Sequence, residues 1–361
     1  MLVRTFGSAV FGIDATTITI EVNIANGVNF MLVGLPDKAV QESHQRIKAA
    51  LKNNNLNYPG KEITINMAPA DIRKEGSTFD LAIGIGILAA SGQISGEKLK
   101  DYLLLGELSL DGTLQLVKGV LPVVMQAKKD GFKGIILPKQ NEPEAAIVDG
   151  IEVYGMENMQ EVIDFLNNSK PFSPAVFNIQ EEFQRQVHEN DVDFKDVKGQ
   201  SAIKRAFEIA ATGGHNIILI GPPGAGKSML AKRLPGILPP MSIEESLETT
   251  KIHSVAGKIG KNNGLVTQRP FRKPHHTISD VALVGGGSYP QPGEISLAHN
   301  GVLFLDELPE YKRQVLEVMR QPLEDRTVTV SRARFSVDYP AGFMLVAAMN
   351  PCPCGYYNHP E

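Results

Sequence analysis

The sequence has few features of a membrane or secreted protein. Only two of its 361 residues are cysteines, which favours a reducing cytoplasm over a disulfide scaffold. No apolar run approaches the roughly 18 residues of a membrane span. The N-terminus, MLVRTFGSAVFGID, has no long apolar core before a cleavage site, so we expect no signal peptide. There is also no low-complexity tract and no internal repeat. We therefore predict a cytoplasmic protein without a membrane segment.

The net charge of −4 is unevenly distributed along the chain. Residues 1–190 carry 17 basic and 23 acidic side chains, whereas residues 191–361 carry 19 and 17. This balance argues against a globally basic surface that coats nucleic acid. The length favours two domains, and 42% apolar residues are enough for packed cores.

The boundary between the domains lies in a polar, proline-containing stretch. Asn167–Pro174 reads NNSKPFSP, and the charged stretch Glu181–Asp191 after it is consistent with a linker helix. We therefore predict domains over residues 1–168 and 191–361, joined by a linker over residues 169–190.

The second half contains a phosphate loop. Residues 221–228 read GPPGAGKS, the G-x-x-x-x-G-K-[ST] pattern, whose glycines let backbone N–H groups turn toward phosphates. Lys227 would supply positive charge to the β and γ phosphates, and Ser228 a hydroxyl ligand for Mg²⁺. Asn216–Ile220 before the loop is typical of a buried strand, and Met229–Arg233 after it continues as a helix. The predicted nucleotide-binding residues are Gly221, Pro222, Pro223, Gly224, Ala225, Gly226, Lys227, Ser228 and Met229.

A second apolar strand ends in two acidic residues. Val302–Leu305 places Asp306 at its carboxyl end, where α/β sheets bind their ligands. Asp306 would hold Mg²⁺, and Glu307 would polarise the attacking water. Together with the phosphate loop, this pair predicts hydrolysis of a nucleoside triphosphate.

Two further segments resemble the AAA+ ATPases. Asp196–Gln200 (DVKGQ) is similar to a motif that precedes the phosphate loop in many of them, and Leu345–Asn350 (LVAAMN) looks like their sensor-1 strand. The resemblance implies that Asn350 hydrogen-bonds the γ-phosphate or the attacking water. An ordinary cap at the end of a strand is the alternative for this residue.

Longer motifs narrow the resemblance. Arg269–Thr277 (RPFRKPHHT), Pro292–Glu307 and Asn350–Gly355 (NPCPCG) together resemble the magnesium-chelatase-like family known as ComM or YifB, along essentially the whole chain. The resemblance implies ATP and Mg²⁺ as cofactors and a homo-hexameric DNA helicase that drives branch migration in natural transformation. The catalytic residues it implies are Lys227, Asp306, Glu307 and Asn350. A chelatase or remodeller of a protein complex is the competing class.

Two segments are candidates for DNA contact. Lys251–Lys273 contains six basic residues and no acidic one, which is consistent with a mobile loop that neutralises phosphates or with a solvated surface loop. Its candidates are Lys258, Lys261, Arg272 and Lys273.

The second candidate is a hairpin. Thr327–Val330 and Phe335–Tyr339 alternate like strands, with Arg332 and Arg334 between them. In a ring these arginines would line the central pore. A salt bridge to a neighbouring subunit, or to Glu324 or Asp325, is the alternative.

Histidine and cysteine pairs raise the question of a metal. Adjacent histidines on a loop seldom share one metal, so we expect a structural or phosphate-contact role for His275 and His276. Cys352 and Cys354 would supply half of a zinc site, and two thiols alone do not complete a tetrahedral one.

The first half resembles the proteolytic domain of Lon, which has a ribosomal-protein-S5-like fold. Lys74–Asp80 (KEGSTFD), Gly106–Gly112 (GELSLDG) and Gly131–Lys139 carry this resemblance. Strands are predicted over residues 16–24 and 62–67, and helices over residues 38–51 and 79–90. The fold class is therefore α/β, with an S5-like α+β domain before an AAA+ P-loop core.

The catalytic serine–lysine pair of Lon is absent from the matching positions of this sequence. Ungapped alignment of the motifs places the Lon serine at Thr78 and its lysine at Leu121, and leucine accepts no proton. Lys118 lies three residues from the required place. Ser77 or Thr78 would instead cap the helix that starts near Phe79. We therefore expect a protease-like scaffold without protease chemistry.

The resemblance also implies parts that the sequence does not contain. An AAA+ core is followed by a helical lid, and the arginine finger of the family lies beyond sensor 1. The chain stops eleven residues after Asn350. We therefore expect a fragment lacking the lid, monomeric or weakly oligomeric, and weakly active, because arginine fingers contribute roughly 10³–10⁵ in rate.

Overall fold

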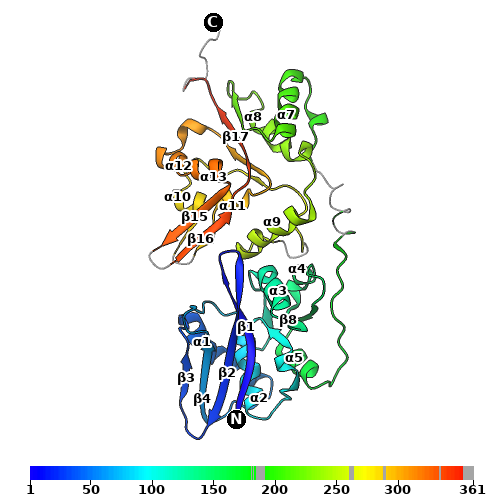
Figure 1. The fold of residues 1–361 in the computed structure, drawn as a ribbon, viewed down its shortest axis with the longest axis vertical. Coiled ribbons are helices and arrows are strands. Elements are labelled where there is room, and N and C mark those ends of the chain that lie inside the picture. Colours follow the sequence, from blue (N-terminus) through cyan, green and yellow to red (C-terminus); the bar gives the residue numbers. More distant parts are fainter. Residues whose placement is uncertain are drawn as a thin grey trace. The chain divides into compact units, whose positions relative to one another are not determined.

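The computed structural model describes residues 1–179, 181, 183, 192–259, 264–287, 290–332 and 335–352. It contains two compact α/β units (Figure 1). One comprises residues 1–178 with 257–264, and the other residues 179–256 with 265–361. Most of the predicted linker helix, Glu181–Asp191, lies outside the described residues and stays a prediction. Among the described helices, none is long and apolar enough to cross a membrane.

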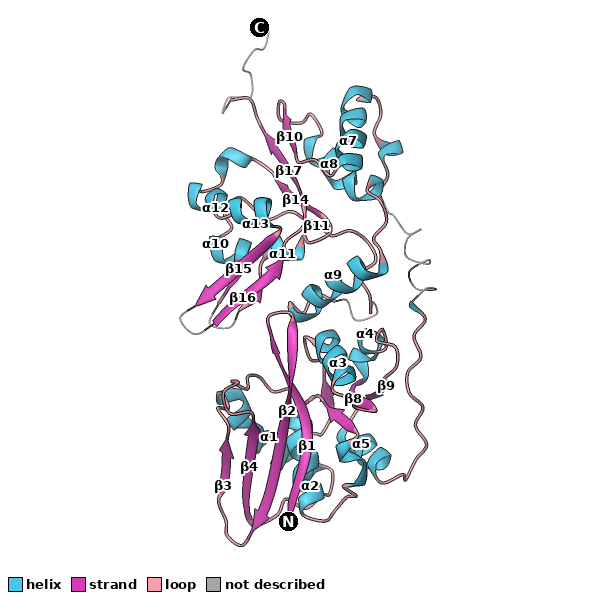
Figure 2. Ribbon diagram, in the orientation of Figure 1, coloured by secondary structure: helices cyan, strands magenta, loops and turns pink. Residues whose placement is uncertain are grey.

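The first unit is built on a four-stranded sheet of order β1-β2-β4-β3 (Figure 2). The strands are β1 (Leu2–Phe11), β2 (Asp14–Ala25), β3 (Phe30–Val33) and β4 (Glu62–Ala68). In β2, apolar and polar residues alternate, so that Ile18, Ile20 and Val22 are buried. This strand and β4 confirm the predictions over residues 16–24 and 62–67.

A second, parallel sheet completes the first unit, in the order β5-β8-β9. Its strands are β5 (Tyr102–Leu104), β8 (Gly134–Pro138) and β9 (Glu152–Met156), and a short pair is formed by β6 (Glu107–Leu108) and β7 (Leu114–Gln115). The helices of the unit are α1 (Lys38–Asn53), α2 (Asp80–Ala90), α3 (Val120–Lys129), α4 (Glu142–Ala145) and α5 (Met159–Leu166). Short 3₁₀ turns cover Glu97–Lys100 and Lys139–Asn141.

Helix α2 forms the centre of the first unit, since every one of its residues is buried. Its first residue, Asp80, is fully buried and receives two hydrogen bonds from Arg46 of α1, at 2.6 and 2.9 Å. Burial raises the pKa of Asp80, and the hydrogen bonds and charge of Arg46 oppose the rise without cancelling it. The ionised form of Asp80 therefore depends on Arg46.

The predicted cap of α2 is wrong. Phe79 occupies the N-cap position, and no side chain caps the helix. Ser77 instead donates its hydroxyl hydrogen bond to the carboxylate of Glu107. Leu121, at the position of the Lon lysine, is fully buried, and its backbone N–H binds Glu144 at 2.9 Å. Lys118 is exposed.

The second unit is built on a parallel sheet of order β10-β17-β14-β11 (Figure 2). These strands are β10 (Ile217–Ile220), β17 (Met344–Met349), β14 (Val302–Leu305) and β11 (Phe271–Arg272). The three strands predicted before the phosphate loop, before Asp306 and before Asn350 are thereby confirmed. The predicted burial of the first is wrong, because β10 is an edge strand on which Ile218 and Ile220 are exposed. The longer helices are α7 (Ser201–Gly213), α8 (Lys227–Arg233) and α9 (Ile243–Val255).

Two antiparallel strand pairs accompany this sheet. The predicted hairpin is present as β15 (Thr327–Arg332) and β16 (Phe335–Pro340), and a smaller pair is formed by β12 (Gly285–Gly286) and β13 (Gln291–Pro292). The remaining helices are α10 (Asp280–Val284), α11 (Glu294–Leu297), α12 (Arg313–Glu317) and α13 (Arg320–Asp325). Short 3₁₀ turns cover Phe194–Asp196, Leu234–Ile237 and η5 (Leu308–Glu310).

The buried ion pair of α2 generates a stability prediction. We expect Arg46→Met to lower the free energy of unfolding of the first unit at pH 7 by about 3–5 kcal/mol, because it leaves Asp80 buried without its cation. The raised pKa of Asp80 means that its ionisation destabilises the fold as pH increases. The loss should therefore shrink as pH falls toward 4.

Denaturant unfolding followed by circular dichroism at several pH values measures this loss. Arg4→Met is the matched control, because the Arg4–Glu21 pair, at 3.0 Å, has an arginine side chain that is 63% exposed. An exposed pair contributes about 0–1 kcal/mol. Equal losses in the two variants, or a loss in Arg46→Met that is constant from pH 7 to pH 4, would contradict the prediction.

Candidate active site

The carboxyl ends of the four parallel strands of the second unit carry polar residues. Strand β10 leads into the loop from Gly221, β17 into Asn350, β14 into Asp306, and β11 into Lys273. Parallel pairing places these ends at one edge of the sheet, with Ile220 opposite Met349 and Leu305 opposite Ala347. Ligands of open α/β sheets bind at this edge.

A cavity of about 360 Å³ lies at this edge. It brings together most of the predicted site residues, although they come from three separate parts of the chain. The lining residues are Pro223, Gly224, Ala225, Gly226, Lys227, Ser228, Met229, Asp306, Glu307, Met349 and Asn350.

The phosphate loop depends on glycine at two positions. Gly224 and Gly226 have φ values of +78° and +83°, in the left-handed region that favours glycine. The Lys227 ammonium donates to the carbonyls of Gly221 and Pro222 at 2.7 and 2.9 Å, and to Asn350 Oδ1 at 3.0 Å. The lysine therefore joins the loop to the end of β17.

Asp306 accepts hydrogen bonds from two side chains. Its Oδ2 lies 2.7 Å from Ser228 Oγ and 2.9 Å from Lys273 Nζ, and its Oδ1 accepts from the Glu307 N–H at 3.1 Å. Burial opposes ionisation of Asp306, but the hydrogen bonds and the Lys273 charge outweigh it, so its pKa is lowered. Asp306 is therefore a carboxylate at neutral pH.

Glu307 adopts a backbone conformation that is rare for a residue with a side chain. Its φ and ψ are 54° and 49°, at the start of the turn η5. Its side chain is 58% exposed, and its carboxylate lies 3.3 Å from His276 Nδ1. Glu307 is therefore accessible to water while one end of its side chain contacts a neighbour.

These residues fit a magnesium-bound triphosphate. Ser228 and Asp306 offer two hard oxygen ligands 2.7 Å apart, which is the ligand type that Mg²⁺ prefers. The glycine-containing loop and Lys227 offer backbone donors and a positive charge to phosphate oxygens. When bound, the metal would neutralise charge on the phosphates.

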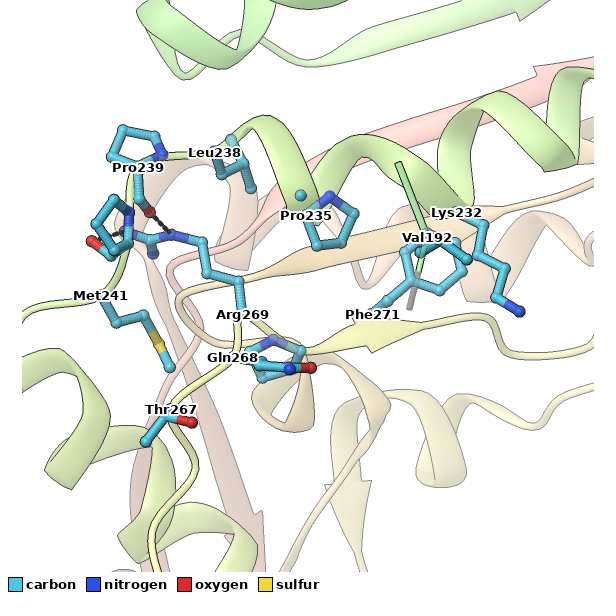
Figure 3. A pocket seen from close by; sticks show the side chains of 13 residues that line it. Val192, Lys232, Pro235, Leu238, Pro239, Met241, Thr267, Gln268, Arg269 and Phe271 are labelled. Carbon is cyan, nitrogen blue, oxygen red and sulfur yellow. Dashed lines mark hydrogen bonds between the residues drawn. The ribbon is translucent and has the colours of Figure 1, made fainter. Parts of the chain in front are cut away.

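The predicted basic loop is wrong at both of its ends. Lys251 belongs to α9, which continues to Val255, and Arg272 belongs to β11. Arg269 lies in the wall of a second cavity of about 710 Å³ (Figure 3), where it donates to the carbonyl of Pro239 at 2.6 Å and contacts Glu245 at 3.1 Å. The content of lysine and arginine in a segment does not show which partners its side chains have, so the prediction missed the contacts of Arg269.

The structure also changes the interpretation of two DNA-contact candidates. Arg272 makes two hydrogen bonds to Glu294, at 2.6 and 2.7 Å, and Lys273 contacts Asp306. Both side chains are therefore paired with carboxylates of this chain, and their contact with DNA stays a prediction. Lys258 is exposed, whereas Lys261 lies outside the described residues.

The hairpin arginines are placed only in part. Arg332 is the last residue of β15, and Arg334 lies outside the described residues. Glu324, one of the alternative partners, contacts Arg320 at 3.0 Å. The contact of these arginines with DNA stays a prediction.

Sequence reasoning missed Lys273 and His276 as neighbours of the acidic pair. Their signal was the segment KPHH, residues 273–276, which follows β11 directly and so starts at the same sheet edge as Asp306. Among the described residues, no group of three or more histidine, cysteine, aspartate or glutamate side chains is arranged to hold a metal ion. Cys354 lies outside that part of the chain, so a zinc site there stays an open hypothesis.

Comparison with protein families identifies both halves of the chain. Residues 193–361 match the family described as magnesium chelatase, subunit ChlI, and residues 20–141 match a family described as subunit ChlI of Mg-chelatase. The competence protein ComM of Haemophilus influenzae is 47% identical over 354 residues, which is 98% of this chain and 69% of that protein. The protein YifB of Escherichia coli is 46% identical over 360 residues, covering 97% and 69%.

A weaker similarity concerns less than half of the chain. Lon protease 2 of Bacillus subtilis is 26% identical over 168 residues, which is 44% of this chain and 30% of that protein. This similarity confirms the resemblance to Lon that the motifs of the first half indicated.

The contacts of Lys227 and Glu307 predict separable defects. We expect Lys227→Ala to weaken ATP binding by about 1–3 kcal/mol, because a charged donor to the phosphates is lost. Glu307→Gln should bind ATP normally and stop turnover. Calorimetry and a phosphate-release assay measure the two effects. Lys232→Ala is the control, since this exposed lysine lies on the same helix α8. Equal ATP affinity of the Lys227→Ala variant and the unmodified chain would refute the assignment.

Proposed function

We propose that this chain, which belongs to the ComM/YifB family of magnesium-chelatase-like AAA+ proteins, is an ATP-driven motor that acts on DNA. The observation that carries the ATPase part is the convergence of two hydrogen-bonded pairs, Lys227–Asn350 and Ser228–Asp306, in the wall of one cavity. We also propose that the second unit is an AAA+ P-loop core and that the first has the S5-like fold.

Each residue of the proposed site has a distinct task. Lys227 and the backbone of the phosphate loop bind and orient the triphosphate. Ser228 and Asp306 are the residues that hold Mg²⁺, which supplies charge neutralisation when bound. Glu307 accepts a proton from the attacking water. Asn350, already in contact with Lys227 at 3.0 Å, orients the water or the terminal phosphate.

The proposal of DNA as the partner is supported by the family and by the hairpin. One relative is named a competence protein, and the resemblance of the motifs implies a hexameric helicase that drives branch migration during natural transformation. The hairpin of β15 and β16 is followed by the strand that leads to Asn350. We further propose that the protein works in the cytoplasm, which is consistent with its two cysteines.

The alternative function is a motor that remodels a protein complex or assists metal insertion. The two family matches, both described as chelatase subunits, favour this alternative. An ATP-dependent protease is disfavoured, because the ungapped alignment of the motifs places Leu121, which is buried, where Lon has its catalytic lysine. A measurement of DNA unwinding distinguishes a motor that acts on DNA from a motor that remodels a protein complex.

A strand-displacement assay tests the proposal. We expect the full-length chain to separate forked or branched DNA when ATP and Mg²⁺ are present, because turnover drives movement along a strand. Glu307→Gln should bind the same DNA and separate none of it. A rate of ATP hydrolysis that does not change when DNA is added, together with no separation of forked or branched DNA, would favour the remodeller.

The hairpin generates a second prediction. Arg332→Ala with Arg334→Ala should weaken DNA binding without preference for sequence, because phosphate contacts carry no base information. Each lost contact on single strands lowers the log–log salt slope by about 0.7, so the slope should become shallower by about 1.4 per engaged subunit.

A salt titration by fluorescence anisotropy measures this slope. ATP hydrolysis without DNA is the internal control and should be little changed, since neither arginine belongs to the predicted phosphate site. A double variant that binds and unwinds like the unmodified protein at every salt concentration would exclude the hairpin. Exposed Lys258 would then be the next residue to test.

A further inference from the structure

The segment between β11 and α10 contacts both acidic residues at the end of β14. Lys273 donates to Asp306 at 2.9 Å, and three residues later His276 Nδ1 lies 3.3 Å from Glu307 Oε2. The two contacts come from one short stretch, Lys273–His276, that is separate in sequence from the phosphate loop and from β14. The stretch is therefore in a position to orient the acidic pair.

The histidine is held in place from two sides. Its ring packs against that of His275 at a tilt of 34°, with centroids 4.1 Å apart, and His275 Nδ1 accepts the Thr277 N–H at 3.3 Å. Tyr311, which is 4% exposed, donates its hydroxyl to the Pro274 carbonyl at 2.7 Å, and its ring meets His276 edge-on at 6.5 Å. A buried tyrosine thus anchors the backbone that carries His276.

The same tyrosine lies four residues after Glu307. Between them runs the turn η5, which is closed by a hydrogen bond from the Glu310 N–H to the Glu307 carbonyl at 2.9 Å. Glu307 and His276 are therefore attached to a common anchor, Tyr311, one through the chain and one through Pro274. This arrangement limits how far the carboxylate and the imidazole can separate.

Glu307 needs such an orienting contact. Its left-handed backbone costs roughly 1–2 kcal/mol and directs an otherwise exposed side chain. A freely rotating carboxylate would spend little time where it can accept a proton from water, and misplacement by about 1 Å can cost a factor of 10² in rate.

We propose that His276 is a positioning residue that holds the Glu307 carboxylate through its Nδ1 atom. The inference rests on the proposed ATPase function and specifies how its proton-accepting residue is oriented. It assigns to His276 a contact with protein rather than with a metal or with phosphate. Tyr311 and Pro274 fix the distance at which the contact is made.

The choice of Nδ1 leads to a stereochemical test. The amide nitrogen of asparagine superimposes on Nδ1 of histidine, whereas that of glutamine superimposes on Nε2. We therefore expect His276→Ala and His276→Gln to lower kcat about tenfold to a hundredfold, with KM for ATP nearly unchanged. His276→Asn should recover most of kcat. His215→Asn is the control and should resemble the unmodified chain, because this histidine is exposed and does not line the nucleotide cavity.

A binding measurement distinguishes positioning from general damage. ADP with aluminium fluoride and Mg²⁺ imitates the state in which water is aligned for attack, so its affinity for the full chain should fall in His276→Ala. The affinity for ADP with Mg²⁺ alone should stay the same. Equal losses for both ligands would show a merely structural role and overturn the inference.

The contact itself is tested without ATP. In ¹⁵N-labelled protein, Nδ1 of His276 should carry a proton, and its resonance should shift in Glu307→Gln while that of buried His253 does not. An unshifted His276 resonance overturns the inference. Absence of hydrolysis in the unmodified chain overturns the proposed function instead, and normal kcat in both His276→Ala and His276→Gln overturns only the role of His276.

Discussion

Parallel pairing of four short strands determines where every reactive group of the second unit lies. The register sets Ile220 beside Met349, Leu305 beside Ala347, and Arg272 beside Leu303, so that the strands end within one edge of the sheet. Backbone hydrogen bonds between strands are not adjustable in small steps, because a slip of one residue moves every side chain of a strand to the opposite face of the sheet. The positions of the phosphate loop, Asp306 and Asn350 therefore follow from the sheet.

Hydrogen bonds and ion pairs fix how the side chains at the carboxyl end of the sheet are oriented. Around Asp306, a hydroxyl from Ser228 and an ammonium from Lys273 share one oxygen, and Lys227 is held by two carbonyls and an amide. Each of these cations is paired with a carboxylate or with carbonyl oxygens, which limits the cost of removing it from water. A site organised in this way offers its donors and acceptors with little rearrangement when phosphates and a metal arrive.

The sequence was sufficient for those features that depend on local pattern. Val302–Leu305 is a run of four buried apolar residues, and its strand has the predicted bounds. The interpretation of Lys251–Lys273 failed because composition does not show partners: Arg269 and Arg272 pair with Glu245 and Glu294, which are distant along the chain. The cap of α2 failed for the same reason, since Ser77 binds Glu107. Contacts of this kind depend on tertiary packing, which periodicity does not encode.

Hydrogen bonds link the base of the hairpin to the residues before β14, the strand that leads to Asp306. Strand β16 ends at Pro340 and β17 begins at Met344, so the base of the hairpin is the start of the strand that carries Asn350. Between them, Gly342 donates to His299 Nδ1 at 2.9 Å, and its carbonyl accepts the Asn300 N–H at 2.7 Å. His299 and Asn300 directly precede β14, which ends at Asp306. The hairpin base, the strand to Asn350 and the strand to Asp306 are thus joined at one glycine, through one backbone hydrogen bond and one hydrogen bond to the His299 ring. A force on the hairpin that displaced Gly342 would load both strands together, and a motor whose hairpin grips its substrate requires such a mechanical connection.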